Sequence, residues 1–159
     1  MTLFQRLAVA CIRVAARRAP DFVIGGTERP YLRRWWLLPR NPVFNVYLHQ
    51  FLRSDDDRAL HDHPWANASV LLAGRYMEHT IAAGGVQRRL LLEAGTVRVR
   101  LTGRMAHRVE LVEGPCWTLF ITGPRYREWG FHCPDKGWIH WMRFTASSDK
   151  GAIGKGCDQ

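Results

Sequence analysis

Residues 61–67 read HDHPWAN, and Gly74 follows after a short apolar run. Side chains at positions i and i+2 of an extended strand point to the same face of the sheet. His61 and His63 are therefore expected to direct their imidazoles into one volume. Neutral imidazole is the commonest protein ligand of metal ions, so this stretch predicts two ligands of a metal site on a β-strand.

A third ligand is expected from His107, which lies in the stretch 103–111, GRMAHRVEL. If these residues form a strand, His107 shares a face with Val109 and Leu111. An apolar face of that kind is typical of the inside of a β-structure. The pattern therefore places the third imidazole in the interior, where the first two would need it.

The rest of the chain reads as short strands separated by Gly and Pro turns. Only residues 2–18 show apolar spacing typical of a helix. Turns are expected at Gly74, at Gly84-Gly85 and at residues 113–115, and residues 125–137 are expected to form a loop. Strands are expected at 43–52, 68–73, 75–81, 86–93, 96–101, 107–112, 116–122 and 138–145. This succession predicts an all-β sandwich or barrel with an N-terminal helix.

The strand expected at 43–52 has two different faces. Val46 and Leu48 belong to an apolar face, whereas Asn45, Tyr47 and His49 alternate with them. The mixed second face could line a polar cavity or could be solvated. Similarly, the charged stretch 54–58 lacks the spacing of a calcium loop, and a solvated turn is the preferred interpretation.

A chain of 159 residues is most simply one domain. We expect an N-terminal helix and irregular linker over 1–30, the barrel over 31–145 and a loose tail over 146–159. The spacing of the four cysteines favours neither a zinc ribbon nor a disulfide scaffold. Because the sequence also has no apolar run of about 20 residues, the expectation is a soluble protein of a reducing compartment, the cytoplasm.

The formal net charge of +9 favours anionic partners. Its basic residues are dispersed, and no nucleic-acid-binding motif accompanies them, so nucleic acid stays a less favoured partner and a solvated basic surface is the simpler interpretation. The Arg-rich helix over 2–18 could be a targeting or membrane-surface segment, although packing on the domain is preferred. An apolar helix and exposed barrel edges also make a homodimer plausible.

At this point the sequence resembles the cupins, whose first motif is Gly, five residues, His-x-His, three or four residues, Glu, six residues, Gly. Here His61, His63 and Gly74 keep that spacing. Asn67 stands at the position of the usual glutamate, and Asp55 stands at that of the first glycine.

The second cupin motif is Gly, five residues, Pro-x-Gly, two residues, His, three residues, Asn. Gly95 and Gly103 match it, with Leu101 in place of the proline. His107 comes one residue late, and Leu111 replaces the asparagine. The resemblance covers about residues 43–145, most of the chain.

The resemblance implies a double-stranded β-helix, or jelly-roll, barrel that holds a divalent metal ion at His61, His63 and His107. An all-histidine site is similar to those of the thiol dioxygenase branch, which implies Fe(II), with Zn, Ni and Mn left open. Asn67 could be a weak fourth ligand, and Glu78 could supply a carboxylate. A barrel without metal remains the alternative.

Substrate contacts are expected from Tyr47, Tyr76 and Arg143, since an arginine and aromatic walls suit a small anionic organic molecule. The favoured function is an Fe(II) dioxygenase acting on such a molecule. One alternative is a metal-independent sugar-type isomerase or epimerase, with His63 as base and Tyr47 or Tyr76 as acid. Another is a non-catalytic module that binds a ligand or nucleic acid.

Overall fold

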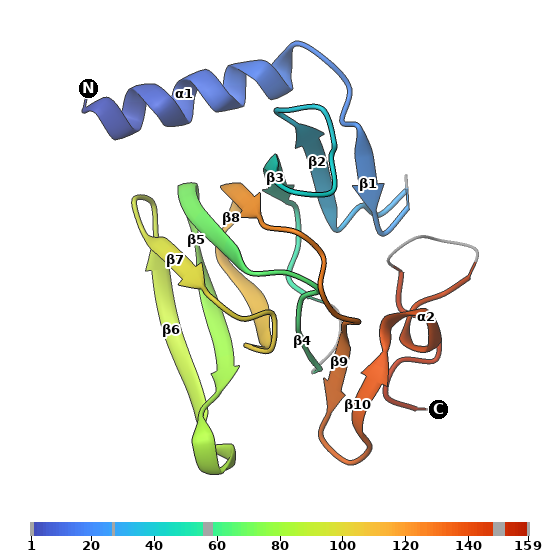
Figure 1. Cartoon of the computed structure of the whole chain (residues 1–159). Helices are drawn as coiled ribbons and strands as arrows, with labels where there is room; N and C mark the ends of the chain where they lie inside the picture. Colours follow the sequence, from blue (N-terminus) through green and yellow to red (C-terminus); the bar gives the residue numbers. More distant parts are fainter. Residues whose placement is uncertain (1, 27, 56–58, 148–151, 159) are drawn as a thin grey trace.

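The computed structural model describes residues 2–26, 28–55, 59–147 and 152–158. Helix α1 (Leu3–Ala16) begins at Thr2, whose side chain accepts a hydrogen bond from the backbone of Gln5 in a capping box. The helix lies across one end of the strands (Figure 1) and buries Ala8 and Cys11 against a core cluster that includes Leu48. The predicted N-terminal helix is thus confirmed, and no described helix is long and apolar enough to cross a bilayer.

All strand pairs among the described residues are antiparallel, and they curl into a half-open barrel (Figure 1). One path through the sheet runs β1-β2-β3-β8-β4-β9-β10, while β5 joins β8 to β6 and β7. The predicted all-β jelly-roll architecture is confirmed. Its strands are β1 (Phe22–Ile24), β2 (Leu32–Trp36), β3 (Asn45–Phe51), β4 (Leu60–His61), β5 (Asn67–Ile81), β6 (Gln87–Glu93), β7 (Val97–Arg100), β8 (His107–Thr122), β9 (Gly130–Cys133) and β10 (Gly137–His140).

Two turns expected from glycines lie inside long strands instead. β5 continues through Gly74 and β8 continues through Gly114. At Gly74 the backbone has a φ of +84°, and a Cβ there would approach Cys116 Sγ to 2.6 Å. Pairing of β5 with β8 shifts register around this residue, so the glycine makes a β-bulge that bends the strand rather than ending it.

The region expected as a loop and a final strand is also organised differently. β9 lies inside the expected loop 125–137, because it pairs with both β4 and β10. The expected strand 138–145 divides into β10 and the short helix α2 (Trp141–Phe144). A side chain at Gly130 would collide with the carbonyl of Ile139, so this glycine permits the close pairing of β9 with β10.

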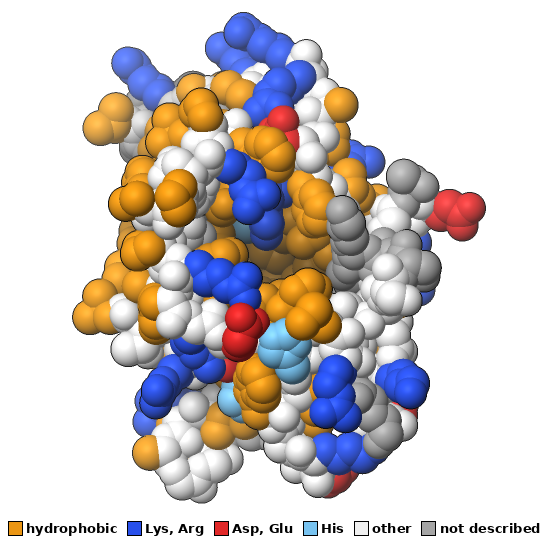
Figure 2. All heavy atoms as spheres, turned by 45° about the vertical axis from the view of Figure 1, so that its right-hand side comes forward, with side chains coloured by type: hydrophobic (Ala, Val, Ile, Leu, Met, Phe, Trp, Pro, Cys, Tyr) orange, Lys and Arg blue, Asp and Glu red, His pale blue; other side chains and the backbone are white. Residues whose placement is uncertain are grey.

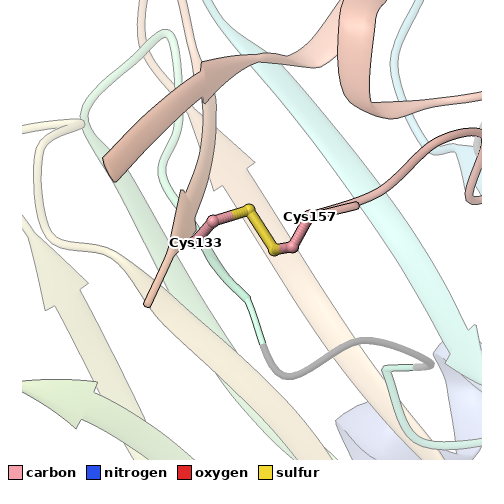
Figure 3. Close-up of a disulfide and its surroundings, with 2 residues drawn as sticks. All are labelled: Cys133 and Cys157. Atoms are coloured by element: carbon pink, nitrogen blue, oxygen red, sulfur yellow. A yellow bond between two sulfur atoms is a disulfide. The ribbon is translucent and has the colours of Figure 1, made fainter. Parts of the chain in front are cut away.

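A disulfide joins Cys133 of β9 to Cys157 of the tail (Figure 3), a pairing that the spacing of the cysteines did not predict. The bond links positions 24 residues apart, brought together because residues 152–158 fold back on α2. The backbone of Gly154 donates to the carbonyl of Phe144 at 3.0 Å. The described part of the tail is therefore held against the domain and is not loose, whereas Cys11 and Cys116 are buried free thiols.

The arginine side chains of strand β7 point into the barrel. Val97 and Val99 are more than half exposed, at 58% and 59%, whereas Arg100 is only 3% exposed. The mixed face of β3 is likewise buried at Tyr47 and His49. The barrel interior therefore contains charged and imidazole groups rather than aliphatic side chains alone.

Candidate metal centre

Antiparallel pairing places the three predicted histidines together. His61 of β4 is the direct cross-strand partner of His107 at the start of β8. The Nε2 atoms of His63 and His107 are 2.9 Å apart although 44 positions separate these residues. One nitrogen from each of the three rings lies within 4.8 Å of the others, so the imidazoles could hold a divalent metal ion.

Local backbone contacts fix the position of His63, which lies two residues beyond His61, the last residue of β4. Its backbone amide donates to the carbonyl of Gly103 at 2.9 Å. A side chain at Gly103 would collide with the carbonyl of His63. The glycine that matched the second motif therefore permits the chain to pass close behind the histidine pair.

Burial makes the three imidazoles suitable ligands. It lowers the pKa of His61, and it lowers the pKa values of His63 and His107 well below the usual range. The nearby Arg100 charge acts in the same direction on each of them. All three rings are therefore neutral near pH 7, the state in which imidazole binds a metal.

Glu78 of β5 orients His107. This carboxylate is 1% exposed and lies 3.1 Å from His107 Nδ1. A carboxylate only accepts, so Nδ1 carries the proton and the Nε2 lone pair faces His63. Arg100 also lies 3.3 Å from Nδ1. Glu78 is nearer to Nδ1, and its carboxylate forms an ion pair with the Arg100 guanidinium.

The two residues considered as fourth ligands are engaged elsewhere. Besides His107, Glu78 contacts Arg100 and lies 2.8 Å from Arg98. Asn67 Oδ1 accepts from Arg100 at 3.4 Å. Both side chains therefore belong to the network behind His107.

Asp62, between the two histidines of the motif, points to the other face of the strand and is 1% exposed. It accepts hydrogen bonds from the Gly130 backbone at 2.8 Å and from Trp138 Nε1 at 3.1 Å. Arg127 and His132 also contact it, at 3.1 and 3.2 Å. Burial would raise the Asp62 pKa, but these hydrogen bonds outweigh it and lower the pKa. The residue thus anchors the histidine pair to β9 and β10, a role the sequence did not reveal.

Asp55 is not the solvated turn residue that was expected. Its Oδ2 accepts from the Val109 backbone at 2.7 Å and lies 3.9 Å from His61 Nδ1. The other acidic residues of that stretch, positions 56 and 57, lie outside the described residues. Asp55 therefore ties the segment before β4 to the strand of His107.

The residues expected to contact substrate lie in three different surroundings. Tyr47 is buried on the inner face of β3, with the Arg34 guanidinium 5.0 Å from the centre of its ring. Tyr76 packs in an apolar cluster with Leu92, and burial raises its pKa to about 12. Arg143 is exposed on α2 and lines a surface hollow there, so the structure does not bring it to the buried histidines.

A second arginine, which sequence reasoning missed, faces the interior. Arg34 of β2 donates from Nε to His49 Nε2 at 2.8 Å. The His49 ring stacks on Phe120 with 5.1 Å between ring centres, and the ring centres of Phe120 and His63 are 5.9 Å apart. A space-filling view shows a hollow in the molecule, with hydrophobic, Lys or Arg and His side chains around it (Figure 2).

The fold and the histidine cluster thus describe a curled antiparallel barrel with a potential metal centre inside. No sequence-family model matches the chain. No curated protein sequence matches it either.

Solved structures of other proteins do resemble it. DMSP lyase DddQ from Ruegeria pomeroyi DSS-3 matches with a TM-score of 0.56 and 17% identity over 77% of this chain and 64% of its own. HppE, in complex with Fe(II) and a substrate, matches with a TM-score of 0.50 and 15% identity over 67% of this chain and 57% of its own. The chain spans less than two thirds of the length of either protein.

These likenesses show the fold, and the fold is that of the cupins. The resemblance carried by the two histidine motifs is confirmed at that level. A divalent metal ion at the three histidines agrees with the donor atoms present.

Proposed function

We propose that this protein is a metal-dependent enzyme, an Fe(II) dioxygenase acting on a small anionic organic molecule. The observation that supports it is the convergence of three neutral imidazoles inside the barrel. When bound there, Fe(II) would supply oxygen chemistry that amino-acid side chains lack. Zn, Ni and Mn ions bind similar ligands, and metal analysis separates them from iron.

The chain's own residues hold and orient the centre. His61, His63 and His107 would be the ligands, and Glu78 keeps the His107 proton on Nδ1. Because the ligands are neutral, they leave the charge of a divalent ion uncompensated. The interior therefore favours an anionic substrate, as the net charge of +9 also does.

Metal content tests the proposal. Protein purified after growth in iron-rich medium is expected to contain about one iron per chain, and His61→Ala and His107→Ala are expected to lose most of it, because three-ligand sites tolerate the loss of a ligand poorly. His79→Ala is the matched control, since His79 pairs with Glu110 on the surface. Wild-type protein without bound metal would contradict the proposal.

Oxygen uptake tests the reaction. The iron-loaded protein is expected to consume O2 in the presence of small acids that carry a thiol, with 3-mercaptopropionate as the first probe. Uptake should cease with a chelator and return with added Fe(II). Turnover of a sugar that survives chelation would instead favour the isomerase, although the raised pKa of Tyr76 makes that phenol a poor proton donor.

A further inference from the structure

Helix α1 has an apolar stripe in water in addition to the face that it buries. The buried face packs on the core cluster around Leu48. Outside that face lie Leu3, Leu7 and Val14, which are 85%, 46% and 38% exposed. At 3.6 residues per turn, these three side chains point within about 40° of one another. They form one continuous line along the helix, which we call the apolar stripe.

Arginines form a second exposed face beside the apolar stripe. Arg6, Arg13 and Arg17 are exposed, and they lie about 80° around the helix from the centre of the stripe. Among the described residues none of the three pairs with an acid, whereas Arg18 pairs with Asp21. Residues 1–20 contain no Asp or Glu. The positive charge of this arginine face is therefore not offset by any carboxylate of the same segment.

The two exposed faces together favour a partner that is both apolar and negatively charged. Leucine and valine side chains are stabilised by leaving water, whereas guanidinium groups are stabilised beside anions. Apolar and basic side chains side by side on a helix are typical of helices that lie in the interface of an acidic bilayer. The stripe from Leu3 to Val14 is about 17 Å long, and a convex helix face fits a flat, deformable surface.

Two other partners fit these faces less well. In a two-fold symmetric dimer the same patch faces itself, so the arginine faces of both copies would come together and repel each other. Nucleic acid would satisfy the arginines, but its phosphates offer no apolar surface to Leu3 and Leu7. Charge complementarity therefore favours an acidic membrane surface.

We infer that α1 binds the surface of an acidic lipid bilayer with its apolar stripe and its arginine face, while its buried face holds the helix on the barrel. Acidic headgroups attract each nearby arginine. The leucines of the stripe would reach the boundary between headgroups and acyl chains. This surface includes no residue of the histidine cluster, so the inference does not depend on the proposed function.

Sedimentation of the full chain with lipid vesicles tests this inference. Vesicles of phosphatidylcholine with about 30% phosphatidylserine are expected to bind the protein at least about tenfold more tightly than phosphatidylcholine alone. The affinity for the acidic vesicles should fall as the salt concentration rises. Equal binding to both kinds of vesicle, or binding to neither, would overturn the inference.

Paired arginine variants separate a local surface from the overall charge of the protein. Arg6→Gln combined with Arg13→Gln is expected to lower the affinity for acidic vesicles at least about fivefold. The matched control combines Arg88→Gln with Arg89→Gln, which removes the same charge from exposed positions of β6 and should lower the affinity less than about twofold. Equal losses of affinity in the two double variants would overturn the inference.

Variants of the stripe test its apolar contribution. Leu3→Gln combined with Leu7→Gln should lower the affinity for acidic vesicles at least about fivefold, whereas Met142→Gln, at a 63% exposed position of α2, should not. Unchanged binding in the leucine variant would mean that the arginines act alone, as they would toward nucleic acid, and would overturn the inference. A wild-type dimer that the leucine variant converts to a monomer in light scattering would overturn it too, because a second copy would then cover the stripe.

A fluorophore on α1 gives a measurement that does not require loss of binding. Ala10 is exposed beside the stripe, and the free thiols of Cys11 and Cys116 are buried, so Ala10→Cys can be labelled selectively. The emission of an environment-sensitive dye there should shift to shorter wavelength with acidic vesicles. The same dye on Asp135→Cys, an exposed position before β10, should show no shift. Unshifted emission at position 10 would overturn the inference even if the other α1 variants failed to fold.

Discussion

The two sides of the histidine cluster are built differently. Behind His107, Glu78 pairs with Arg98 and Arg100 and lies 3.1 Å from Nδ1 of the imidazole. On the other side, Arg34 contacts an imidazole and an aromatic ring without an acid. The first side is a network of paired charges, and the second holds a cation with no acidic partner among the described residues.

The difference predicts which charges hold the site together. A buried ionic network stabilises only when its members are satisfied, and the loss of one member leaves the others uncompensated. Arg34 is half-buried, and a cation without a counter-ion at such a position contributes little to folding. Substitutions on the two sides should therefore change stability by different amounts.

Glu78→Gln is expected to have the largest effect on stability. It leaves Arg98 and Arg100 without their counter-ion, and breaking such a buried network costs about 3–5 kcal/mol in the free energy of unfolding. Loss of the acceptor at His107 Nδ1 should also weaken metal binding by about 10–100-fold. Urea denaturation of the metal-free protein and a metal titration measure the two effects.

Glu93→Gln is the control for that measurement. Glu93 lies 3.5 Å from Arg75, and both side chains are exposed. Its removal should change the free energy of unfolding by less than about 1 kcal/mol. Equal losses of unfolding free energy in Glu78→Gln and Glu93→Gln would contradict the distinction between a buried charge network and an ordinary surface pair.

The pH dependence of stability should show that both sides are buried. His49, His63 and His107 have pKa values well below the usual range, chiefly because burial disfavours the charged ring. Below a pH of about 6.5 the unfolded chain takes up protons that the folded chain refuses. The free energy of unfolding of the metal-free protein should therefore fall as the pH falls through 6.5, by on the order of 1 kcal/mol for each histidine at pH 5.5.

Urea denaturation at several pH values checks this expectation. His49→Phe should remove between about a quarter and a third of the decrease between pH 7 and 5.5, because His61, whose pKa is also lowered, contributes as well. Loss of the Asp62 ion pairs belongs to a lower pH range, since the pKa of that carboxyl is itself lowered. A stability that stays constant from pH 7 to 5.5 would show that the imidazoles accept protons in the folded state.

Asp62→Asn should have an intermediate effect. It keeps the shape of the side chain but removes the charge that Arg127 and His132 contact. Hydrogen bonds to a charged group contribute about 1.5–3 kcal/mol, so a loss near 2 kcal/mol is expected in the urea experiment. Asp135→Asn, at an exposed position before β10, should change the free energy of unfolding little.

The sequence predicted the histidine cluster because its information is local. Side chains two residues apart in an extended segment lie on one face, and the alternation of apolar residues after His107 indicates a strand that faces the interior. The antiparallel pairing of His61 with His107 then brings the three rings together. Short strands between turn residues predicted a β-sandwich or barrel for the same reason, and the resemblance to the cupins implied the jelly-roll.

The surroundings of the cluster could not be predicted in this way. Alternation in β7 indicates a strand but does not say which face is inside, and the arginine face proved to be buried. Arg34 gives no local sign of its surroundings, and Asp62 accepts from Gly130 of β9, a segment expected to be a loop. Each of these contacts depends on non-local pairing, as does the disulfide between Cys133 and Cys157.

Arg34→Met is expected to have the smallest effect on stability, and it completes the contrast with Glu78→Gln. The substitution removes one hydrogen bond to His49, which contributes about 1 kcal/mol, but it also relieves the desolvation of an unpaired cation. The free energy of unfolding should therefore change by less than about 1 kcal/mol. Arg100→Met, at a fully paired position, should cost about 3–5 kcal/mol in the same experiment because it leaves Glu78 partly uncompensated. If Arg34→Met lowered the free energy of unfolding as much as Arg100→Met, Arg34 would stabilise the fold. Both sides of the histidine cluster would then have a structural role.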